Sequence, residues 1–518
     1  MTEFATRRDT AYANRLQPAI EQFVSQFKIN SHSNIDMRRT IFLFPGGLGS
    51  QLVRAFESFP SPAQSFERVW LDAELLLDAP RLTMLPGDID SEQKCIVPDG
   101  CVDIPGIVLL CPYDNFIQWC RLNSIDLFVF GWDWRRSVQD AADFFLNIFL
   151  PMFDARFGGQ SPHPLDHFTL VGHSAGGMVV KAILNSTTNR FVQRVEKAIT
   201  VATPFYGYGG QIHRFLKGDP YLSPGLFPCS VIASITSSLP GGYEYLYLDH
   251  PTYRANQVAL ANDPEGFNLG AYPSMDIDNP MEVADPYDPT PDANGKVRYP
   301  LQFGFDFELL QKGKATAHNV ARPFADPAIA AKFFNVRGVQ SRNGQILSNT
   351  CVGQSWARIS PAFDPDLNID PIEDKMGPGD GTQPAWTARL LGLPASQIIS
   401  VVGDDIDHAT MLNVPRVQTK IAGLIGLDVA ALRVVPDILG FAQRAASLSR
   451  FQEFVDEVGS LTVGRLLTRE QGNALKSIFF RNFPPAQLQG FLARYYLEAL
   501  RHPSHARVSS TSTTPTPR

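Results

Sequence analysis

The stretch of residues 167–184 constrains the fold of this chain more than any other part of its sequence. It reads HFTLVGHSAGGMVVKAIL, an apolar run followed by a G-x-S-x-G pattern and a helical apolar segment. A β-strand that turns sharply into a helix at such a pattern exposes the serine hydroxyl above a sheet, and the glycines relieve crowding at the turn. The pattern predicts that Ser174 is a nucleophile; the alternative is an ordinary Gly-rich turn. His173 lies beside it, but the turn directs neighbouring side chains away from the hydroxyl, so we expect a packed structural histidine.

Short apolar runs typical of buried strands recur along the chain between helical stretches. They are residues 40–44, 127–130, 168–171, 198–201, 333–336 and 398–402. Strands that alternate with helices favour an α/β fold with a mostly parallel sheet and helices on both faces. Hydrophobic residues make up 44% of the chain and charged residues 19%, which is enough apolar surface to bury a large core.

The length of 518 residues exceeds that of a usual single domain, so we expect one large catalytic body with an accessory module. The expected parts are an N-terminal helical extension (1–35), an α/β catalytic domain (36–427) with an irregular cap insertion (about 205–332), a C-terminal helical module (428–507) and a disordered tail (508–518). The cap is predicted from a tract rich in Pro, Asp, Gly and Tyr, and the helical module from apolar periodicity with a capping box at Thr468 and Gln471. In this module, AL (474–475), NFP (482–484) and Leu488 weakly resemble the effector-associated adaptor modules of bacterial conflict systems. A helical layer packed on the catalytic domain is the alternative.

Charge and hydropathy argue against nucleic-acid binding and against a transmembrane helix. The 45 basic and 52 acidic residues give a net charge of −7 without a basic stripe, so we expect no nucleic acid. The longest apolar run, residues 144–153, falls far short of the roughly 20 residues that a bilayer span requires, so no transmembrane helix is expected. The N-terminal arginines precede no apolar segment, and we therefore expect a cytoplasmic protein.

The cysteines and acidic residues indicate neither a metal nor another cofactor. The chain has six cysteines without a Cys-x-x-Cys pair, which favours buried thiols, and a bond between Cys95 and Cys101 stays open. In the cap, Asp285, Asp288 and Asp292 do not follow the spacing of a 12-residue calcium loop, and a solvated loop is the stronger interpretation.

A nucleophilic serine needs a base, and the base needs an acid that orients it. In the chain order Ser, Asp, His, the turn-rich residues 377–382 supply Asp380, and the loop after the run at 398–402 supplies His408. We predict Asp380 as the orienting acid and His408 as the general base. The alternatives are Asp374, Asp404, Asp405 and Asp407 for the acid and His213, His250, His318, His502 and His505 for the base.

Acyl transfer also needs backbone N–H donors for the developing oxyanion. One donor is expected from Ala175, the residue after the nucleophile. The other is expected from the loop at residues 45–50 (PGGLGS), which follows an early strand, with Gly47 preferred and Leu48 next. A tight turn without catalytic duty is the alternative; the loop does not match a phosphate-binding loop.

Several short motifs, in this order and spacing, resemble the lecithin:cholesterol acyltransferase and lysosomal phospholipase A2 family of α/β-hydrolases. They are PGGLGSQL (45–52), VWLD (69–72), WDWR (132–135), GHSAG (172–176), ATP (202–204), GDGT (379–382) and DH (407–408). The resemblance implies an α/β-hydrolase fold, a triad of Ser174, Asp380 and His408, and the amides of Gly47 and Ala175 as oxyanion donors. It also implies a cap that docks at lipid surfaces. The WDWR motif either shapes the site or forms a strand-end Asp–Arg pair with packed indoles.

The function expected from these features is a serine-dependent hydrolase of lipid acyl esters, of the phospholipase A or lipase type, working through an acyl-enzyme. An acyltransferase with the same mechanism is the first alternative. The second is an effector whose hydrolase domain is controlled by a protein partner through the C-terminal helices.

Overall fold

A computed structural model describes most of the catalytic region. The described residues are 7–30, 39–57, 64–70, 84, 95–101, 112–158, 163–208, 210–211, 235–246, 263, 265, 267, 306–356 and 372–433. The expected C-terminal module from residue 434 onward, the tail, much of the cap and its three aspartates therefore lie outside the described residues. Among the residues that are described, no helix has the length and apolar character needed to cross a membrane.

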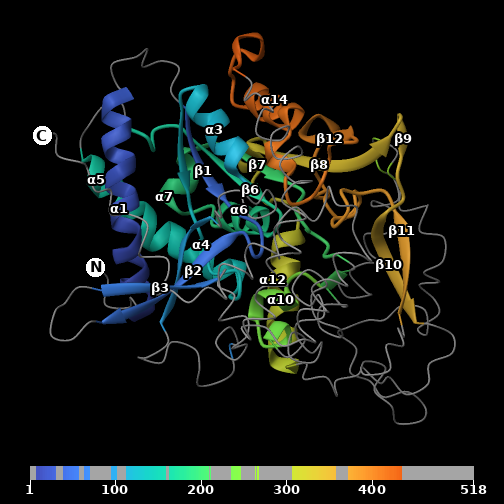
Figure 1. The fold of residues 1–518 in the computed structure, drawn as a ribbon, viewed down its shortest axis with the longest axis horizontal. Helices are drawn as coiled ribbons and strands as arrows, with labels where there is room; N and C mark the ends of the chain where they lie inside the picture. The colour runs from blue at the N-terminus through green and yellow to red at the C-terminus, as the bar shows by residue number, and fades with distance from the viewer. Residues whose placement is uncertain are drawn as a thin grey trace, which may run out of the picture.

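The centre of the molecule is a parallel sheet (Figure 1). Its strands, in spatial order, are β12 (Ile398–Gly403), β8 (Phe333–Arg342), β7 (Val195–Val201), β6 (Phe168–His173), β1 (Arg39–Phe44) and β5 (Ile125–Val129). All neighbours in this order pair in parallel, and the short β9 (Gln345–Ile346) adds antiparallel to β8. Each of the six predicted apolar runs coincides with one of these strands, except that the run at 127–130 extends one residue past β5. The predicted α/β-hydrolase fold is confirmed.

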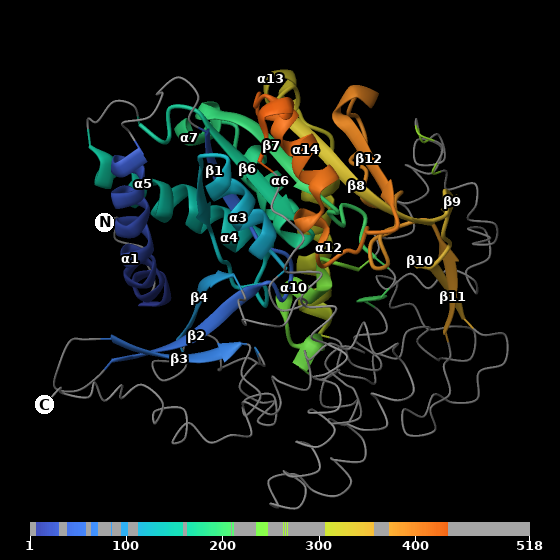
Figure 2. The ribbon, with the colours of Figure 1, turned by 45° about the horizontal axis from the view of Figure 1, so that its top comes forward.

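Helices cover both faces of the sheet (Figure 2). Side chains alternate between the faces along a strand, so Phe42 and Phe44 of β1 point to one core and Ile41 and Leu43 to the other. The first core is covered by α1 (Arg7–Asn30), α4 (Val138–Phe144), α5 (Leu150–Phe157) and α6 (Ala175–Asn185). The second core is covered by α3 (Asp114–Leu122) and α14 (Pro415–Leu424). The remaining short elements are the π-helix Phe145–Phe149, α7 (Arg190–Arg194), and the 3-10 turns Ala395–Gln397, Met411–Asn413 and Val429–Ala431.

Helix α1 lies within the residues where an N-terminal helical extension is expected, and it is built into the first core. Tyr12 stacks on Phe144 with ring centroids 4.3 Å apart, and Phe23 packs against Phe153 at 5.3 Å. Phe27, near the end of the helix, meets Phe157 edge-on. These rings are buried, so the helix covers part of the first core on this face of the sheet.

Two antiparallel sheets were not predicted from the sequence. One consists of β3 (Gln64–Trp70), β2 (Ser50–Glu57) and β4 (Ile96–Cys101), and β2 begins at the end of the glycine-rich loop. The other is the hairpin of β10 (Thr350–Trp356) and β11 (Ile372–Gly377), which leads into the loop of Asp380. Cys95 directly precedes β4 and Cys101 ends it, so the strand separates them and they form no disulfide with each other.

The described parts of the cap are α10 (Pro240–Tyr243), α12 (Phe307–Ala321), α13 (Pro327–Ala330) and a few isolated residues. Helix α10 is tied to α12 because the backbone N–H of Asp306 donates to the Tyr243 hydroxyl at 2.9 Å. It is tied to the catalytic body because the side-chain carboxyl of Glu244 accepts from the N–H of Val138 at 2.9 Å. Helices α10 and α12 are therefore linked to each other and, through Glu244, to the start of α4.

Candidate active site

Ser174 occupies the turn between β6 and α6. Its backbone has φ 52° and ψ −128°, a left-handed conformation that is costly for a residue with a side chain. The chain is so tight here that a Cβ at Gly172 would lie 2.6 Å from the carbonyl oxygen of Gly176. A Cβ at Gly176 would collide with the carbonyl oxygen of Phe44 on the neighbouring strand. The two glycines of the G-x-S-x-G pattern therefore allow the turn that exposes the serine hydroxyl.

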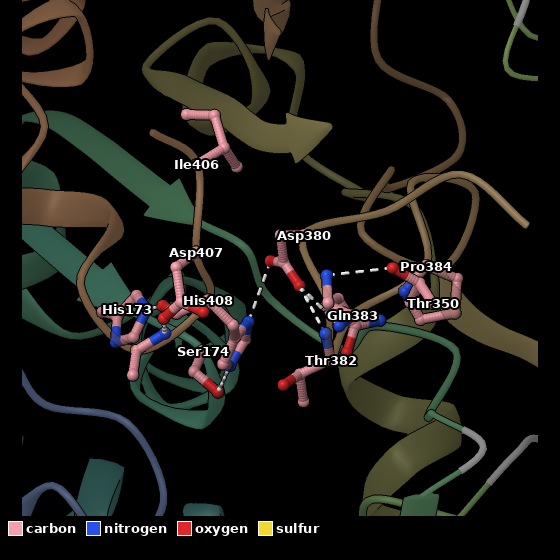
Figure 3. A network of polar contacts seen from close by, with 12 residues as sticks. His173, Ser174, Thr350, Asp380, Thr382, Gln383, Pro384, Ile406, Asp407 and His408 are labelled. Atoms are coloured by element: carbon pink, nitrogen blue, oxygen red, sulfur yellow. Dashed lines mark hydrogen bonds and ion pairs between the residues drawn. The ribbon is translucent and has the colours of Figure 1, made fainter. Parts of the chain in front are cut away.

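The structure brings Ser174, His408 and Asp380 together from three loops (Figure 3). His408 Nε2 is 2.9 Å from Ser174 Oγ, and His408 Nδ1 is 2.8 Å from Asp380 Oδ2. An ionised carboxylate only accepts hydrogen bonds, so Nδ1 carries the proton and Nε2 is left to accept from the serine O–H. The Asp380 side chain is 1% exposed and that of His408 14%, so the acid is enclosed while the base reaches the surface of the site.

Asp380 is held by its own loop. Its Oδ1 accepts from the backbone N–H groups of Thr382 at 3.1 Å and Gln383 at 2.6 Å, which leaves Oδ2 for the histidine. Its carbonyl oxygen accepts from the N–H of His408 at 3.0 Å. The acid is thus bonded to the base through both its side chain and its backbone, which fixes the spacing of the two loops.

The alternatives for acid and base that the structure describes are placed differently from Asp380 and His408. Asp405 is exposed and pairs with Arg416 at 2.8 Å, and Asp407 accepts from the N–H of Ala409 in the turn that carries the base. Asp404 is exposed, and His318 lies in the last turn of α12. The side chain of Asp374 and the residues His213, His250, His502 and His505 lie outside the described part of the chain.

The glycine-rich loop lies against the nucleophile. A Cβ at Gly46 would be 2.9 Å from Ser174 Cβ, and one at Gly47 would be 3.7 Å from Ala175 Cβ. Gly47 is exposed, and Leu48 has a φ of 66°. Ala175 is the first residue of α6, where N–H groups have no acceptor within the helix and the helix dipole favours negative charge. Gly46 and Gly47 therefore lie against Ser174 and Ala175. The assignment of the Gly47 and Ala175 N–H groups as oxyanion donors stays a prediction.

The WDWR motif combines both interpretations given to it. Asp133 and Arg135 form a buried two-point ion pair at 2.9 and 2.8 Å; burial opposes ionisation of the carboxyl, but the charges of Arg135, Arg8 and Arg136 outweigh it and lower its pKa. The indole N–H of Trp132 donates to the carbonyl oxygen of Pro45 at 2.7 Å. The ion pair thus holds the WDWR segment in place, and this segment supports the glycine-rich loop through the bond from Trp132 to Pro45.

His173 is not hydrogen-bonded to the Ser174 hydroxyl. Its two ring nitrogens have other partners. Its Nε2 is 2.8 Å from the carbonyl oxygen of His408, and its Nδ1 is 3.0 Å from the hydroxyl of Tyr113. Burial, together with the nearby His408, lowers the pKa of His173 to about 3, so the ring is neutral. Sequence reasoning missed Tyr113, which belongs to no motif and gives no signal of its own.

A second feature that the sequence does not reveal is Arg337, a fully buried arginine on β8. Its guanidinium binds both oxygens of Asp263, and it lies 2.9 Å from Glu265 Oε2 and 3.1 Å from the carbonyl oxygen of Ala385. Burial opposes ionisation of Asp263, but its bonds to Arg337 outweigh this and lower its pKa. The arginine therefore fastens a segment of the cap to the sheet beside the loop of Asp380.

Comparison with known proteins agrees with the predicted resemblance. Phospholipase A(1) LCAT3 of Arabidopsis thaliana is 23% identical to this chain over 378 residues, which cover 66% of this chain and 78% of the plant protein. Among solved structures, a chain of the Tle4-Tli4 complex matches with a TM-score of 0.40 and 13% identity, over 75% of this chain and 98% of that chain. No family model matches the chain. The chain is thus a distant relative of a plant protein of the LCAT type, and the predicted similarity is confirmed.

Proposed function

We propose that this chain is a serine-dependent hydrolase of lipid acyl esters, of the phospholipase A or lipase type. The observation that carries the proposal is the continuous hydrogen-bonded line from Asp380 through His408 to Ser174 at a strand-to-helix turn. An enclosed acid, an imidazole and a hydroxyl bonded in that order are what a serine needs to become a nucleophile at neutral pH.

In the first half of the reaction, Ser174 Oγ attacks the ester carbonyl carbon while His408 Nε2 takes the serine proton. The carbonyl oxygen becomes an oxyanion, which the N–H groups of Gly47 and Ala175 stabilise. Asp380 holds the imidazolium that forms and keeps the proton on Nδ1. The intermediate then breaks its bond to the alkoxy oxygen, which leaves as an alcohol with the proton from Nε2.

In the second half, water attacks the acyl-enzyme. His408 Nε2 takes a proton from the water, the same two N–H groups stabilise the second oxyanion, and the bond to Ser174 Oγ breaks as the proton returns to the serine. The products are a carboxylic acid and the free enzyme. An alcohol in place of water would give a new ester, so the acyltransferase alternative differs only in which nucleophile reaches the acyl-enzyme.

A lipid substrate is supported by the relative that shares most of its length with this chain. That protein is named a phospholipase A(1) and its matched region covers 78% of it. The motifs that carry the resemblance include the glycine-rich loop, the serine turn and the loops of the acid and base. We therefore assign an acyl ester of a glycerolipid as the substrate class.

The test is covalent labelling with a fluorophosphonate, followed by assays on phospholipid vesicles and on short p-nitrophenyl esters. The wild-type protein is expected to be labelled and to release fatty acid, and Ser174→Ala is expected to lose labelling and at least about 10⁴-fold of kcat. Ser186→Ala is the matched control, because Ser186 lies beyond the other end of α6. Equal activity of wild-type and Ser174→Ala proteins would refute the proposal, and a product ester formed with added alcohol would favour acyl transfer.

A further inference from the structure

A chain of buried hydrogen bonds joins the two loops on either side of the nucleophile. It begins at the N–H of Gly46, which donates to the Tyr113 hydroxyl at 2.7 Å. The Tyr113 oxygen is 3.0 Å from Nδ1 of His173, and Nε2 of His173 is 2.8 Å from the carbonyl oxygen of His408. The chain therefore runs from the residue before Gly47 to the backbone of the base.

The donor at one end, the Gly46 N–H, and the acceptor at the other, the His408 carbonyl, fix the direction of every bond. The His408 carbonyl oxygen only accepts, so His173 must carry its proton on Nε2. A neutral imidazole then has a lone pair on Nδ1, and that lone pair accepts from the Tyr113 O–H. The Tyr113 oxygen in turn accepts from Gly46, so each polar group in the chain has a partner and only one arrangement of protons satisfies all of them.

We propose that Tyr113 and His173 are positioning residues that hold the oxyanion loop and the base loop in register with Ser174. This inference rests on the proposed function. Tyr113 precedes α3, His173 ends β6 and His408 follows β12, so the pair links three segments far apart in sequence. Oxyanion donors and a general base act only if they are held within a fraction of an ångström of the reacting atoms.

The neutral state of His173 is part of this role. The rings of His173 and His408 are 5.2 Å apart between centroids, and His408 must become an imidazolium during each half-reaction. A cationic His173 at that distance would oppose this charge. Burial of the ring favours the neutral form and outweighs the bond to the His408 carbonyl, which favours protonation. The Tyr113 hydroxyl, by donating to Nδ1, also favours the neutral Nε2–H form.

The substitution Tyr113→Phe removes both hydroxyl bonds and keeps the ring. We expect kcat to fall about tenfold while KM changes less than about twofold, because the bonds position reacting groups and do not bind substrate. Tyr206→Phe is the matched control, since Tyr206 is equally buried and its hydroxyl accepts from a backbone N–H, that of Leu391, at 3.0 Å. The control is expected to lose similar stability and to keep its kcat; equal kcat values for the two variants would overturn the proposal.

A second pair of variants separates positioning from packing. In His173→Gln the side-chain amide retains an N–H that can donate to the His408 carbonyl, whereas His173→Leu fills a similar volume without a donor. We expect the Gln variant to keep kcat within about tenfold of wild type and the Leu variant to fall about 100-fold or more. Equal losses in both variants would contradict the proposed donation to the base loop.

A spectroscopic measurement does not depend on turnover. In protein labelled with ¹⁵N only in histidine, the signal absent from His173→Gln identifies His173. We expect it to report the Nε2–H form and to stay neutral down to pH 5, and a protonated ring or the Nδ1–H form would overturn the inference. If this signal is as expected but the wild type is not labelled by fluorophosphonate, the proposed serine-hydrolase function is refuted while the hydrogen-bonded arrangement of His173 stands. If the wild type is active and Tyr113→Phe matches it, only the positioning role fails.

Discussion

Asp380 illustrates how much depends on the orientation of one carboxylate. Its Oδ1 is committed to the N–H groups of Thr382 and Gln383, so only Oδ2 faces the base. In Asp380→Asn the amide oxygen would keep those backbone donors, and the amide NH₂ would face Nδ1 of His408. The imidazole would then carry its proton on Nε2, where it cannot accept from Ser174. We expect kcat to fall about 10³- to 10⁴-fold with little change in KM, measured on a short ester.

The control for this change is Asp405→Asn, in the same loop as the base. Asp405 is exposed and its partner is Arg416, so the same chemical substitution leaves the line from acid to serine intact. It is expected to keep kcat within about twofold of wild type. A comparable loss in both variants would mean that the loop, and not the orientation of the imidazole, is responsible.

Among single residues, the sequence predicts those whose local pattern carries their chemistry. Ser174 is recognisable because the turn needs glycines at fixed spacing, and Asp380 and His408 because chain order and loop position select them. Tyr113 and Arg337 are not recognisable, because their partners lie 67 and 74 residues away. Contacts at such separation depend on the folded sheet and leave no pattern in the nearby sequence.

At the scale of elements, the end of α10 is joined to the start of α4 by the buried carboxyl of Glu244. Burial raises its pKa to about 8 from an ordinary 4.5, although its bonds to Ser137 and Val138 lower it in part. The folded state therefore holds a proton that the unfolded chain releases, and the associated stability is full below about pH 4.5 and declines as pH rises toward 8. The junction between cap and body should weaken in this range.

We expect Glu244→Gln to remove this pH dependence, because the amide keeps an acceptor for Val138 and has no proton to lose. In urea unfolding, the free energy of the variant relative to wild type should increase by at least about 1 kcal/mol from pH 5 to pH 8. Glu308→Gln on α12 is the control, since Glu308 is 77% exposed and should show no such increase. A difference between Glu244→Gln and wild type that stays constant with pH would contradict the raised pKa.

At the scale of the whole molecule, the central sheet is predictable because strands buried on both faces are apolar throughout. The ends of these strands are less predictable. Strand β8 continues beyond the predicted run at 333–336 to Arg342, through the polar residues Gln340 and Ser341. The antiparallel sheets of β2–β4 and β10–β11 are not predictable, because their pairing joins segments separated by loops and their strands mix polar and apolar residues. The central sheet is therefore predictable from the sequence, whereas the two antiparallel sheets outside it are not. These outer sheets adjoin the glycine-rich loop and the loop of Asp380 and support them.

The N-terminal helix gives the sharpest test of how the whole molecule is assembled. Phe23 of α1 is 6% exposed, and its ring packs against those of Phe128 on β5 and Phe153 on α5. Truncation to Ala leaves a cavity where the helix meets the sheet, so we expect Phe23→Ala to lower the free energy of unfolding by about 3–5 kcal/mol. Gln22→Ala, the adjacent exposed position, should change it by less than about 0.5 kcal/mol. Equal midpoints of urea unfolding for both variants would show that α1 is not part of the folded core, and that residues 1–35 are a separable extension.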